Sequence, residues 1–131
     1  MLRVESPFTD ELEALVKRVV DVGFTVHREL GPGFRENIYH AAFRLELDAR
    51  AIPFESEKVV EVKYKHWTLP GQKIDLIVAG VVLVELKAVP RLRTVHREQV
   101  RSYLRATGVR VGLLMNFNQP LFKTGLKRVL A

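Results

Sequence analysis

Two carboxylates and one ammonium interrupt a strongly apolar stretch of this chain, IDLIVAGVVLVELKA at residues 74–88. They belong to Asp75, Glu85 and Lys87. A stretch this apolar predicts a core β-hairpin, and ionised side chains in a core are costly unless they are paired or bind a metal. Lys87 could offset the two acids, and so could a divalent cation, because Asp and Glu oxygens are the ligands that Mg²⁺ or Mn²⁺ selects. The residues therefore indicate either a metal site or a salt-bridged pair on a solvated sheet edge.

The parity of the stretch separates its charges from its apolar residues. Strand side chains alternate between two faces, and Asp75, Glu85 and Lys87 all occupy odd positions. The even positions are all apolar: Ile74, Leu76, Val78, Val82, Val84, Leu86 and Ala88. A three-residue loop at 79–81, with Gly80 for its special backbone angles, pairs each residue with one of the same parity. Asp75 then lies directly across from Glu85, where two like charges repel unless something positive offsets them.

The elements that position this hairpin can be predicted from periodicity. Apolar residues at spacings of three and four predict helices, and alternation predicts strands. The expected elements are a helix from Thr9, a helix over about 34–50, a strand at 58–65, two strands in 74–88, a helix over about 95–107 and a strand at 109–117. This order predicts an α/β fold with a mixed central sheet flanked by helices.

Three of these elements carry more specific expectations. The buried stripe of the second helix is expected to be Phe34, Ile38, Ala41, Ala42 and Leu45. The alternation in KVVEVKYK at 58–65 places Val60, Val62 and Tyr64 on one side of a half-buried strand. The tail at 123–131 fits either a short helix or an edge strand.

Composition bounds the class of protein. The chain has 131 residues, which predicts a single domain over 1–131 with its own hydrophobic core. It has no cysteine, so disulfides and thiolate zinc sites are excluded. The N-terminus carries acids and no long apolar run, and no window approaches the roughly 20 apolar residues of a membrane span. We therefore expect a cytoplasmic protein without membrane association.

The net charge of +6 is concentrated in one segment. Residues 87–110 contain a single acid, Glu98, and a basic cluster whose surplus equals that of the whole chain. The basic residues are Lys87, Arg91, Arg93, Arg97, Arg101, Arg105 and Arg110. Such a cluster favours a phosphate-bearing partner, hence nucleic acid, with a solvated arginine-rich helix face as the alternative.

Two motifs resemble those of a known family. Asp75, followed after nine residues by Glu-Leu-Lys at 85–87, resembles the signature of the PD-(D/E)XK nuclease superfamily, with Ile74 where the signature has proline. The segment GFRENIY at 33–39 resembles the Gly-x-x-Glu-x-x-Tyr motif that names the GxxExxY protein family, a branch of that superfamily. The flanks VHRELGPGF and VGLLMNFN are similar to further hallmarks of the family, and the resemblance runs from about residue 12 to residue 130.

The resemblance implies the αβββαβ core of restriction-endonuclease-like proteins and a set of site roles. Asp75 and Glu85 would bind the metal, with the Leu86 carbonyl as a further oxygen ligand. Glu36 corresponds to the helix acid that completes the metal site in several branches. Lys87 would orient or help deprotonate the attacking water, or stabilise charge on the phosphate.

The helix expected over about 95–107 would complete this site. Gln99 and Tyr103 resemble the Gln-x-x-x-Tyr motif of the RecB-like and lambda-exonuclease-like branches, and at i and i+4 they share one helix face. The expected nucleic-acid-binding residues are Arg91, Arg93, Arg97, Arg101 and Arg105, of which the last three form a stripe that is expected to place charge beside the site.

The implied function is hydrolysis of phosphodiester bonds by a Mg²⁺- or Mn²⁺-dependent nuclease, with DNA as substrate rather than RNA. Two alternatives stay open: a non-catalytic nucleic-acid-binding module that keeps the fold, and an assembly protein whose apolar hairpin or tail supports a homodimer. Metal binding that depends on Asp75 and Glu85 separates the nuclease from the first alternative. Salt-insensitive self-association without nucleic-acid affinity would mark the second.

Overall fold

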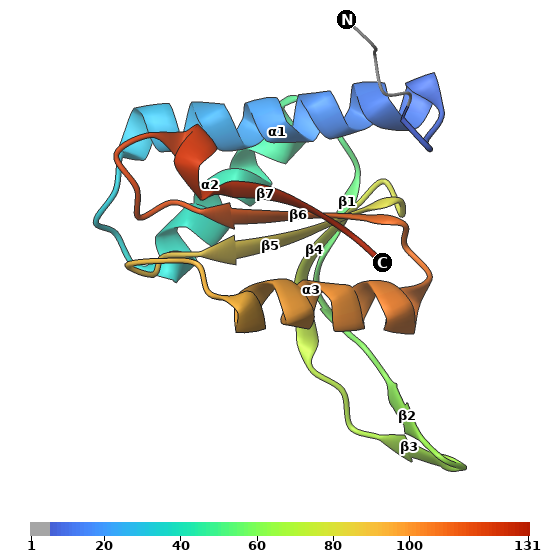
Figure 1. Ribbon diagram of the computed structural model, residues 1–131. Helices are drawn as coiled ribbons and strands as arrows, with labels where there is room; N and C mark the ends of the chain where they lie inside the picture. The colour runs from blue at the N-terminus through green and yellow to red at the C-terminus, as the bar shows by residue number, and fades with distance from the viewer. Residues whose placement is uncertain (1–5) are drawn as a thin grey trace, which may run out of the picture.

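Helices cover both faces of a central five-stranded sheet (Figure 1). The computed structural model describes residues 6–131. Its elements are α1 (Asp10–Leu30), α2 (Glu36–Ala49), β1 (Phe54–Val59), β2 (Val62–Tyr64), β3 (Trp67–Leu69), β4 (Lys73–Val78), β5 (Val82–Lys87), α3 (Thr94–Thr107), β6 (Val111–Asn116), the 3₁₀ helix η1 (Phe122–Gly125) and β7 (Leu126–Leu130). Helices α1 and α2 lie on one side of the sheet and α3 on the other. The expected α/β class is confirmed.

The sheet is mixed, with strand order β1-β4-β5-β6-β7. Strands β5 and β6 are parallel and α3 makes the crossover between them, whereas all other neighbours are antiparallel. Strand β5 is therefore central, with a hydrogen-bonded neighbour on each side and helices over both faces. A strand in this position reads as an almost continuous apolar run, which explains the composition of 82–87.

Two apolar clusters attach the helices to the sheet. On the side of α1 and α2 the buried residues of the hairpin are Leu76, Val78, Val82, Val84 and Leu86. On the other side Ile77 and Leu83 pack with Val100 and Leu104 of α3. The predicted even face is thus a core face from Leu76 onwards, and the apolar odd positions Ile77 and Leu83 are covered by α3.

The predicted parity is wrong at Ile74, which belongs to the cluster on the α3 side. The strands are irregular at the neighbouring position. On β1, Ser56 pairs with Leu76 and Lys58 pairs with Ile74, but Glu57 between them has a positive φ of 53°. This left-handed residue lies on the edge strand opposite Asp75, where the alternation of side chains between the two faces breaks down although the register is the same on both sides.

The buried stripe predicted for the second helix is also wrong. Helix α2 buries Tyr39, Phe43 and Leu47, which follow one another at i, i+4 and i+8. The Tyr39 ring stacks on Phe117, with centroids 4.7 Å apart. The residues expected on this stripe are half-buried or exposed instead: Phe34, Ile38, Ala41, Ala42 and Leu45, the last of which is 70% exposed. The contact between Tyr39 and Phe117, which are 78 positions apart, determines which face of α2 is buried. The spacing of apolar residues alone could not predict that face.

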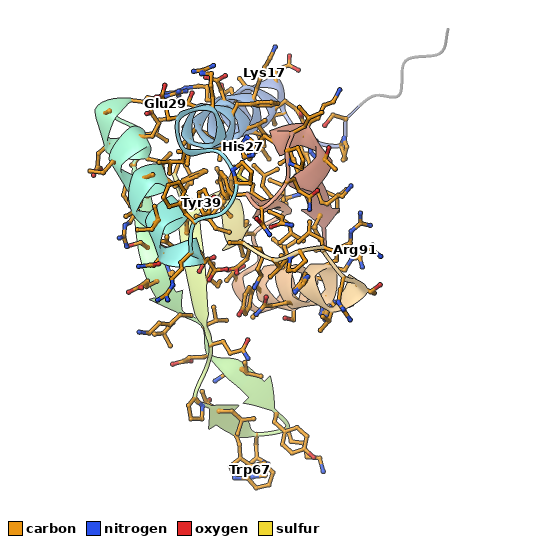
Figure 2. The ribbon with its side chains drawn as sticks, turned by 90° about the vertical axis from the view of Figure 1, so that its left-hand side faces the viewer. Lys17, His27, Glu29, Tyr39, Trp67 and Arg91 are labelled. Atoms are coloured by element: carbon orange, nitrogen blue, oxygen red, sulfur yellow. The ribbon has the colours of Figure 1, made fainter. Side chains whose placement is uncertain are left out.

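The single strand predicted at 58–65 is two strands separated by a bend. Strand β1 ends at Val59 and β2 begins at Val62, and a third strand, β3, pairs with β2 to form a separate two-stranded sheet. We call residues 60–72, which leave the body between β1 and β4, the arm; Figures 1 and 2 show it protruding beyond α3. Because it leaves the body, Tyr64 is exposed and only Val60 of the expected apolar side is buried.

The ends of the chain follow the sequence more closely. Thr9 caps α1 as expected, since its Oγ1 accepts a hydrogen bond from the backbone N–H of Leu12 at 3.2 Å. The tail, for which a helix and an edge strand were both open, contains η1 followed by the edge strand β7. None of the helices within 6–131 combines the length and the apolar character that crossing a membrane requires.

Candidate active site

The β4–β5 hairpin has the predicted register. Its pairs are Leu76 with Val84, Ile77 with Leu83, and Val78 with Val82. The loop is Ala79-Gly80-Val81, and φ is 51° at Ala79 and 73° at Gly80. The Val81 N–H closes the turn by donating to the Val78 carbonyl at 3.0 Å. Continued past Leu76, this register brings Asp75 to Glu85.

At Asp75 and Glu85 the carboxylates take over part of the backbone hydrogen bonding. The Asp75 N–H donates to Glu85 Oε1 at 2.9 Å, and the Leu86 N–H donates to Asp75 Oδ2 at 2.8 Å. Glu85 is only 3% exposed, and no Lys or Arg among residues 6–131 is ion-paired with either acid. The pair is therefore not a salt bridge on a solvated sheet edge.

Burial and mutual repulsion disfavour the charged form of this pair. Burial, followed by the charge of Asp75, raises the pKa of Glu85 to about 8. The same two causes raise the pKa of Glu36, whereas the nearby charge of Lys87 acts to lower it. A carboxyl whose pKa lies near neutrality in a polar corner of a core is typical of functional sites.

Lys87 is held by a chain of hydrogen bonds that runs through α3 to the base of the arm. Its Nζ donates to Gln99 Oε1 at 3.0 Å, and Gln99 Nε2 donates to the Tyr103 hydroxyl at 3.2 Å. That hydroxyl donates to Gln72 Oε1 at 2.8 Å. The expected pair Gln99 and Tyr103 thus faces the sheet beside Lys87, and its catalytic role stays a prediction.

The segment that follows Lys87 is anchored by Asn116, a buried residue that sequence reasoning missed. Its Oδ1 accepts the Val89 N–H at 3.0 Å and its Nδ2 donates to the Val89 carbonyl at 2.8 Å. The Phe117 N–H donates to the Lys87 carbonyl at 2.9 Å. The backbone on both sides of the lysine is therefore fixed. The sequence feature that could have revealed Asn116 is a single amide side chain at the end of an otherwise apolar strand.

The Gly-x-x-Glu-x-x-Tyr segment brings Glu36 to the site. Gly33 has φ 108°, a conformation that favours glycine, and Glu36 is the first residue of α2. The Tyr39 hydroxyl donates to the Gly31 carbonyl at 2.6 Å and accepts the Phe34 N–H at 3.1 Å. The tyrosine ties down the loop from which the helix begins, so the motif positions the acid through its glycine and its tyrosine.

His40 is a second residue that sequence reasoning missed. Its Nε2 lies 3.8 Å from Asp75 Oδ1, which is too long for a hydrogen bond. This nitrogen is buried and has no hydrogen-bond partner within 6–131. Its position could have been predicted from the sequence, because His40 is at i+4 from Glu36 and residues at that spacing share a helix face.

The arginines of α3 do not face Lys87. Residues two apart on a helix point about 200° away from each other, so Arg97 and Arg101 lie on the opposite side of α3 from Gln99. Arg91, Arg93, Arg97 and Arg105 are exposed, and Arg101 is ion-paired with Glu98 at 2.5 Å. Figure 2 shows Arg91 at the outer edge of the molecule. The stripe is an outer surface, not a wall of the site as the sequence had suggested.

The donor atoms suit a hard divalent cation, but they are not gathered into a complete coordination sphere. Carboxylates are ordinary ligands for Mg²⁺ or Mn²⁺, and His40 Nε2, which has no hydrogen-bond partner within 6–131, lies 3.8 Å from Asp75 Oδ1. Within 6–131 no three His, Cys, Asp or Glu side chains lie close enough together to hold a metal ion. The structure brings Asp75 and Glu85 together. The roles of Glu36 and of the Leu86 carbonyl as ligands stay predictions.

Comparison with protein families identifies the chain. Residues 13–129 match the PD-(D/E)XK nuclease superfamily. The chain belongs to this superfamily. No curated protein and no solved structure matches it. PD-(D/E)XK proteins are in general metal-dependent nucleases, which supports a nuclease-type function and a nucleic-acid substrate for this one.

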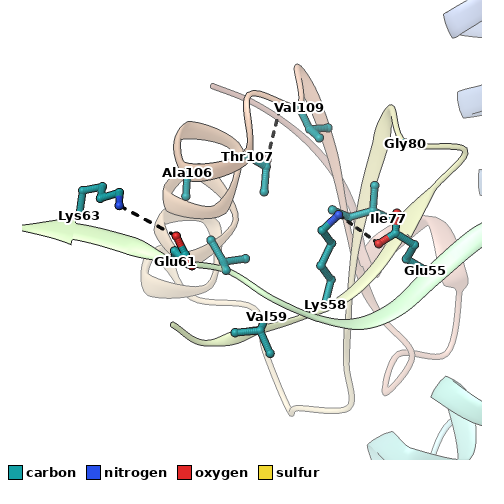
Figure 3. A pocket seen from close by; sticks show the side chains of 11 residues that line it. Glu55, Lys58, Val59, Glu61, Lys63, Ile77, Gly80, Ala106, Thr107 and Val109 are labelled. Atoms are coloured by element: carbon teal, nitrogen blue, oxygen red, sulfur yellow. Dashed lines mark hydrogen bonds and ion pairs between the residues drawn. The ribbon is translucent and has the colours of Figure 1, made fainter. Parts of the chain in front are cut away.

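A pocket of this PD-(D/E)XK protein lies away from the acid pair. It has a volume of about 370 Å³ and is lined by the edge strand β1, the base of the arm and the C-terminal end of α3 (Figure 3). Asp75, Glu85 and Lys87 are not among its lining residues. The residues of the superfamily signature therefore lie at the open end of the β4–β5 hairpin and not in this pocket.

Proposed function

We propose that this PD-(D/E)XK protein is a Mg²⁺- or Mn²⁺-dependent nuclease of the GxxExxY branch that cleaves DNA in preference to RNA. The observation that carries the proposal is the pair of half-buried Asp75 and buried Glu85, joined by hydrogen bonds between carboxylates and backbone N–H groups, with Lys87 two residues along β5. The branch is supported by the roles of Gly33 and Tyr39 in holding the helix that begins at Glu36.

Asp75 and Glu85 would hold the cation, with Glu36 and the Leu86 carbonyl as further ligands. A bound Mg²⁺ or Mn²⁺ supplies polarisation of the phosphoryl oxygen and a lowered pKa for bound water. The support is electrostatic, because the pKa of Glu85 is raised by burial and by Asp75. A cation held by these acids would offset the charge of Asp75 and stabilise the charged form of Glu85, so its binding would release the proton that Glu85 holds near neutral pH.

Lys87 acts on the substrate side of this arrangement. An ammonium has three N–H donors, and one is used by Gln99 at 3.0 Å. The others are available to orient the attacking water or to stabilise the charge that develops on the phosphate. Gln99 and Tyr103 are positioning residues in this scheme, since they fix Lys87 and do not need to touch substrate.

The arginines contribute at longer range. Arg91 and Arg93 before α3 and Arg97 and Arg105 on it are exposed, and they give the protein a positive field that attracts a polyanion and raises its association rate. DNA is favoured over RNA through the resemblance to the RecB-like and lambda-exonuclease-like branches carried by Gln99 and Tyr103.

The test compares Lys87→Ala with Lys17→Ala, an exposed lysine on α1. Both variants remove one positive charge, so non-specific binding changes equally. With Mn²⁺ or Mg²⁺ and end-labelled single- and double-stranded DNA and RNA, we expect Lys87→Ala to lose about 100-fold or more in cleavage rate and Lys17→Ala to keep it. Equal cleavage by both variants would show that the activity comes from a contaminant and would refute the assignment.

Calorimetry separates the nuclease from a non-catalytic binding module. We expect Mn²⁺ to bind the wild-type protein and to bind Asp75→Asn at least tenfold more weakly. Nucleic-acid binding without any metal binding that depends on Asp75 would favour the non-catalytic module.

A further inference from the structure

The arm has two chemically different faces. Val62 pairs with Leu69, Lys63 with Thr68, and Tyr64 with Trp67. Because paired residues, and residues two apart, lie on the same face of a ribbon, one face carries Val62, Tyr64, Trp67 and Leu69. The opposite face carries Lys63 and Thr68, which are joined by a hydrogen bond. The arm is an amphipathic hairpin.

Nothing in the described chain covers the apolar face. Tyr64 is 55% and Trp67 is 53% exposed, and the two aliphatic residues beside them are also exposed. The Tyr64 and Trp67 rings are nearly parallel, with an interplanar angle of 18° and centroids 6.3 Å apart, and His66 lies against Trp67 at 3.7 Å. Isolated two-stranded hairpins are marginal in water, and a group of exposed large apolar side chains marks a binding surface.

The charge of the arm identifies an anionic partner. The arm contains two lysines, Lys63 and Lys65, and one acid, Glu61, whose carboxylate lies 4.0 Å from Lys63 Nζ. Two further lysines, Lys58 and Lys73, lie in the strands that flank the arm. Lys65 lies in the turn at the tip, with its Nζ 5.5 Å from the Tyr64 ring centroid. Aromatic rings flanked by lysines provide faces for bases and charges for phosphates.

The base of the arm is joined to the candidate active site. Val59 pairs with Lys73, and the Val60 N–H donates to the Gln72 carbonyl at 2.9 Å. The Gln72 side chain accepts from Tyr103, the last member of the hydrogen-bond chain that begins at Lys87. The arm therefore leaves the sheet at the end where Asp75 lies.

We propose that the arm binds single-stranded nucleic acid, with bases stacking on Tyr64 and Trp67 and a phosphate held by Lys65 at the tip. This inference rests on the proposed nuclease function and names its substrate class. A single strand is favoured over a duplex because a duplex keeps the faces of its bases stacked inside, where the rings cannot reach them.

A second copy of the chain fits this face less well. Two protomers with a net charge of +6 each, joined through a basic arm, would place like charges together. A stable dimer also buries about 800 Å² on each partner, from roughly 20 residues or more. Four exposed side chains on a narrow ribbon cannot supply that area by themselves.

The fluorescence of Trp67 reports directly on binding at the arm, because it is the one tryptophan of the chain. The wild-type protein in EDTA is titrated with a 20-nucleotide single-stranded DNA, the same RNA and a blunt DNA duplex. We expect the single strands to quench Trp67 fluorescence and to bind about tenfold more tightly than the duplex. The two single strands share the stacking chemistry, so they identify whether DNA or RNA is preferred.

Variants assign the binding to the arm. We expect Trp67→Ala and Tyr64→Ala each to weaken single-strand binding about tenfold in fluorescence anisotropy, in line with the loss of one stacked base. The matched control is Leu45→Ala, which removes an exposed apolar side chain from α2 and is expected to change nothing. Lys65→Ala is likewise expected to weaken single-strand binding, and its matched control is Lys17→Ala on α1, which is expected to change the affinity less.

The outcomes separate this inference from the proposed function, because binding is measured without metal. Unchanged single-strand affinity in the Tyr64→Ala, Trp67→Ala double variant, or unquenched Trp67 fluorescence in the wild type, would overturn the arm's role even if the protein cleaves DNA. Concentration-dependent dimerisation that Trp67→Ala abolishes would overturn it in favour of a second copy. Suppose that single strands quench Trp67 and the arm variants lose about tenfold in affinity, but the protein cleaves no nucleic acid. That result would support binding by the arm and would refute only the proposed nuclease function.

Discussion

The two ends of the β4–β5 hairpin share one alternating pattern and serve opposite purposes. At the turn end three residue pairs form a regular ladder, and Ile77 and Leu83 are buried beneath α3. At the open end the same odd positions hold Asp75 and Glu85, and their carboxylates accept backbone N–H groups from the facing strand. The turn end buries apolar surface, whereas the open end buries the carboxyl group of Glu85.

The hairpin gains stability at its turn end and loses it at its open end. Apolar burial contributes roughly 25 cal/mol per Å², and the central position of β5 makes this burial nearly complete at the turn end. At the open end the raised pKa of Glu85 shows that folding disfavours its charged form. An arrangement that opposes stability at one end of an otherwise regular hairpin is expected at a functional site.

Leu83→Ala, at the turn end of the hairpin, is expected to have the largest effect on stability. Leu83 is fully buried between the sheet and α3, so its truncation leaves a cavity and should lower the free energy of unfolding by about 3 kcal/mol. Urea unfolding measures the loss. Val81→Ala, at an exposed odd position of the loop, is the control and should cost less than about 0.5 kcal/mol. Similar losses in the two variants would show that the turn end is not the stabilising one.

The open end is tested by Glu85→Gln in EDTA, which should raise the free energy of unfolding. The carboxyl has an ordinary pKa of 4.5 when unfolded and about 8 when folded. Below pH 4.5 it is protonated in both states, so the variant gains little. As pH rises towards 8 the unfolded chain releases the proton first, which destabilises the wild-type protein. The gain should reach about 2 kcal/mol at pH 8, less than the full pKa difference implies because the amide that replaces the carboxyl is itself a buried polar group.

Thermal unfolding between pH 4 and pH 8.5 measures this gain. Glu29→Gln, an exposed acid on α1, is the matched control and should show no such pH dependence. With Mn²⁺ the order should reverse, because the cation stabilises the wild type and not the variant. A gain that is the same at pH 4 and pH 8 would contradict the assigned cause.

Local sequence rules predicted the hairpin well and its surroundings less well. The register followed from parity and a three-residue loop, both of which are local. The face of α2 did not, because it is chosen by the contact between Tyr39 and Phe117, which are distant in the sequence. The arm was missed because the alternation of 58–65 continues through the bend after Val59, and alternation does not reveal whether a ribbon leaves the body.

The site shows the same division between local and distant contacts. The closeness of Asp75 to Glu85 could be predicted because both lie in one hairpin, and that of Gln99 to Lys87 because Gln99 lies on a helix with a clear polar face. Their roles in a site stay predictions. The arginine stripe was assigned to the site although its position two residues from Gln99 turns it away. His40 was missed because its importance comes from Asp75, a residue on another element.

The smallest test concerns the strand beside the open end. Glu57 has φ 53° opposite Asp75, and a left-handed conformation costs a residue other than glycine about 1 kcal/mol. Glu57→Gly should therefore stabilise the protein by roughly 0.5 kcal/mol, because the relief of strain exceeds the added freedom of the unfolded chain. The control is Lys58→Gly at the next position, which pairs with Ile74 in register and should destabilise by about 1 kcal/mol. Calorimetric melting compares the two variants. Destabilisation of equal size in both would mean that β1 is regular at Glu57, and the irregularity of the open end would then be confined to the two carboxylates.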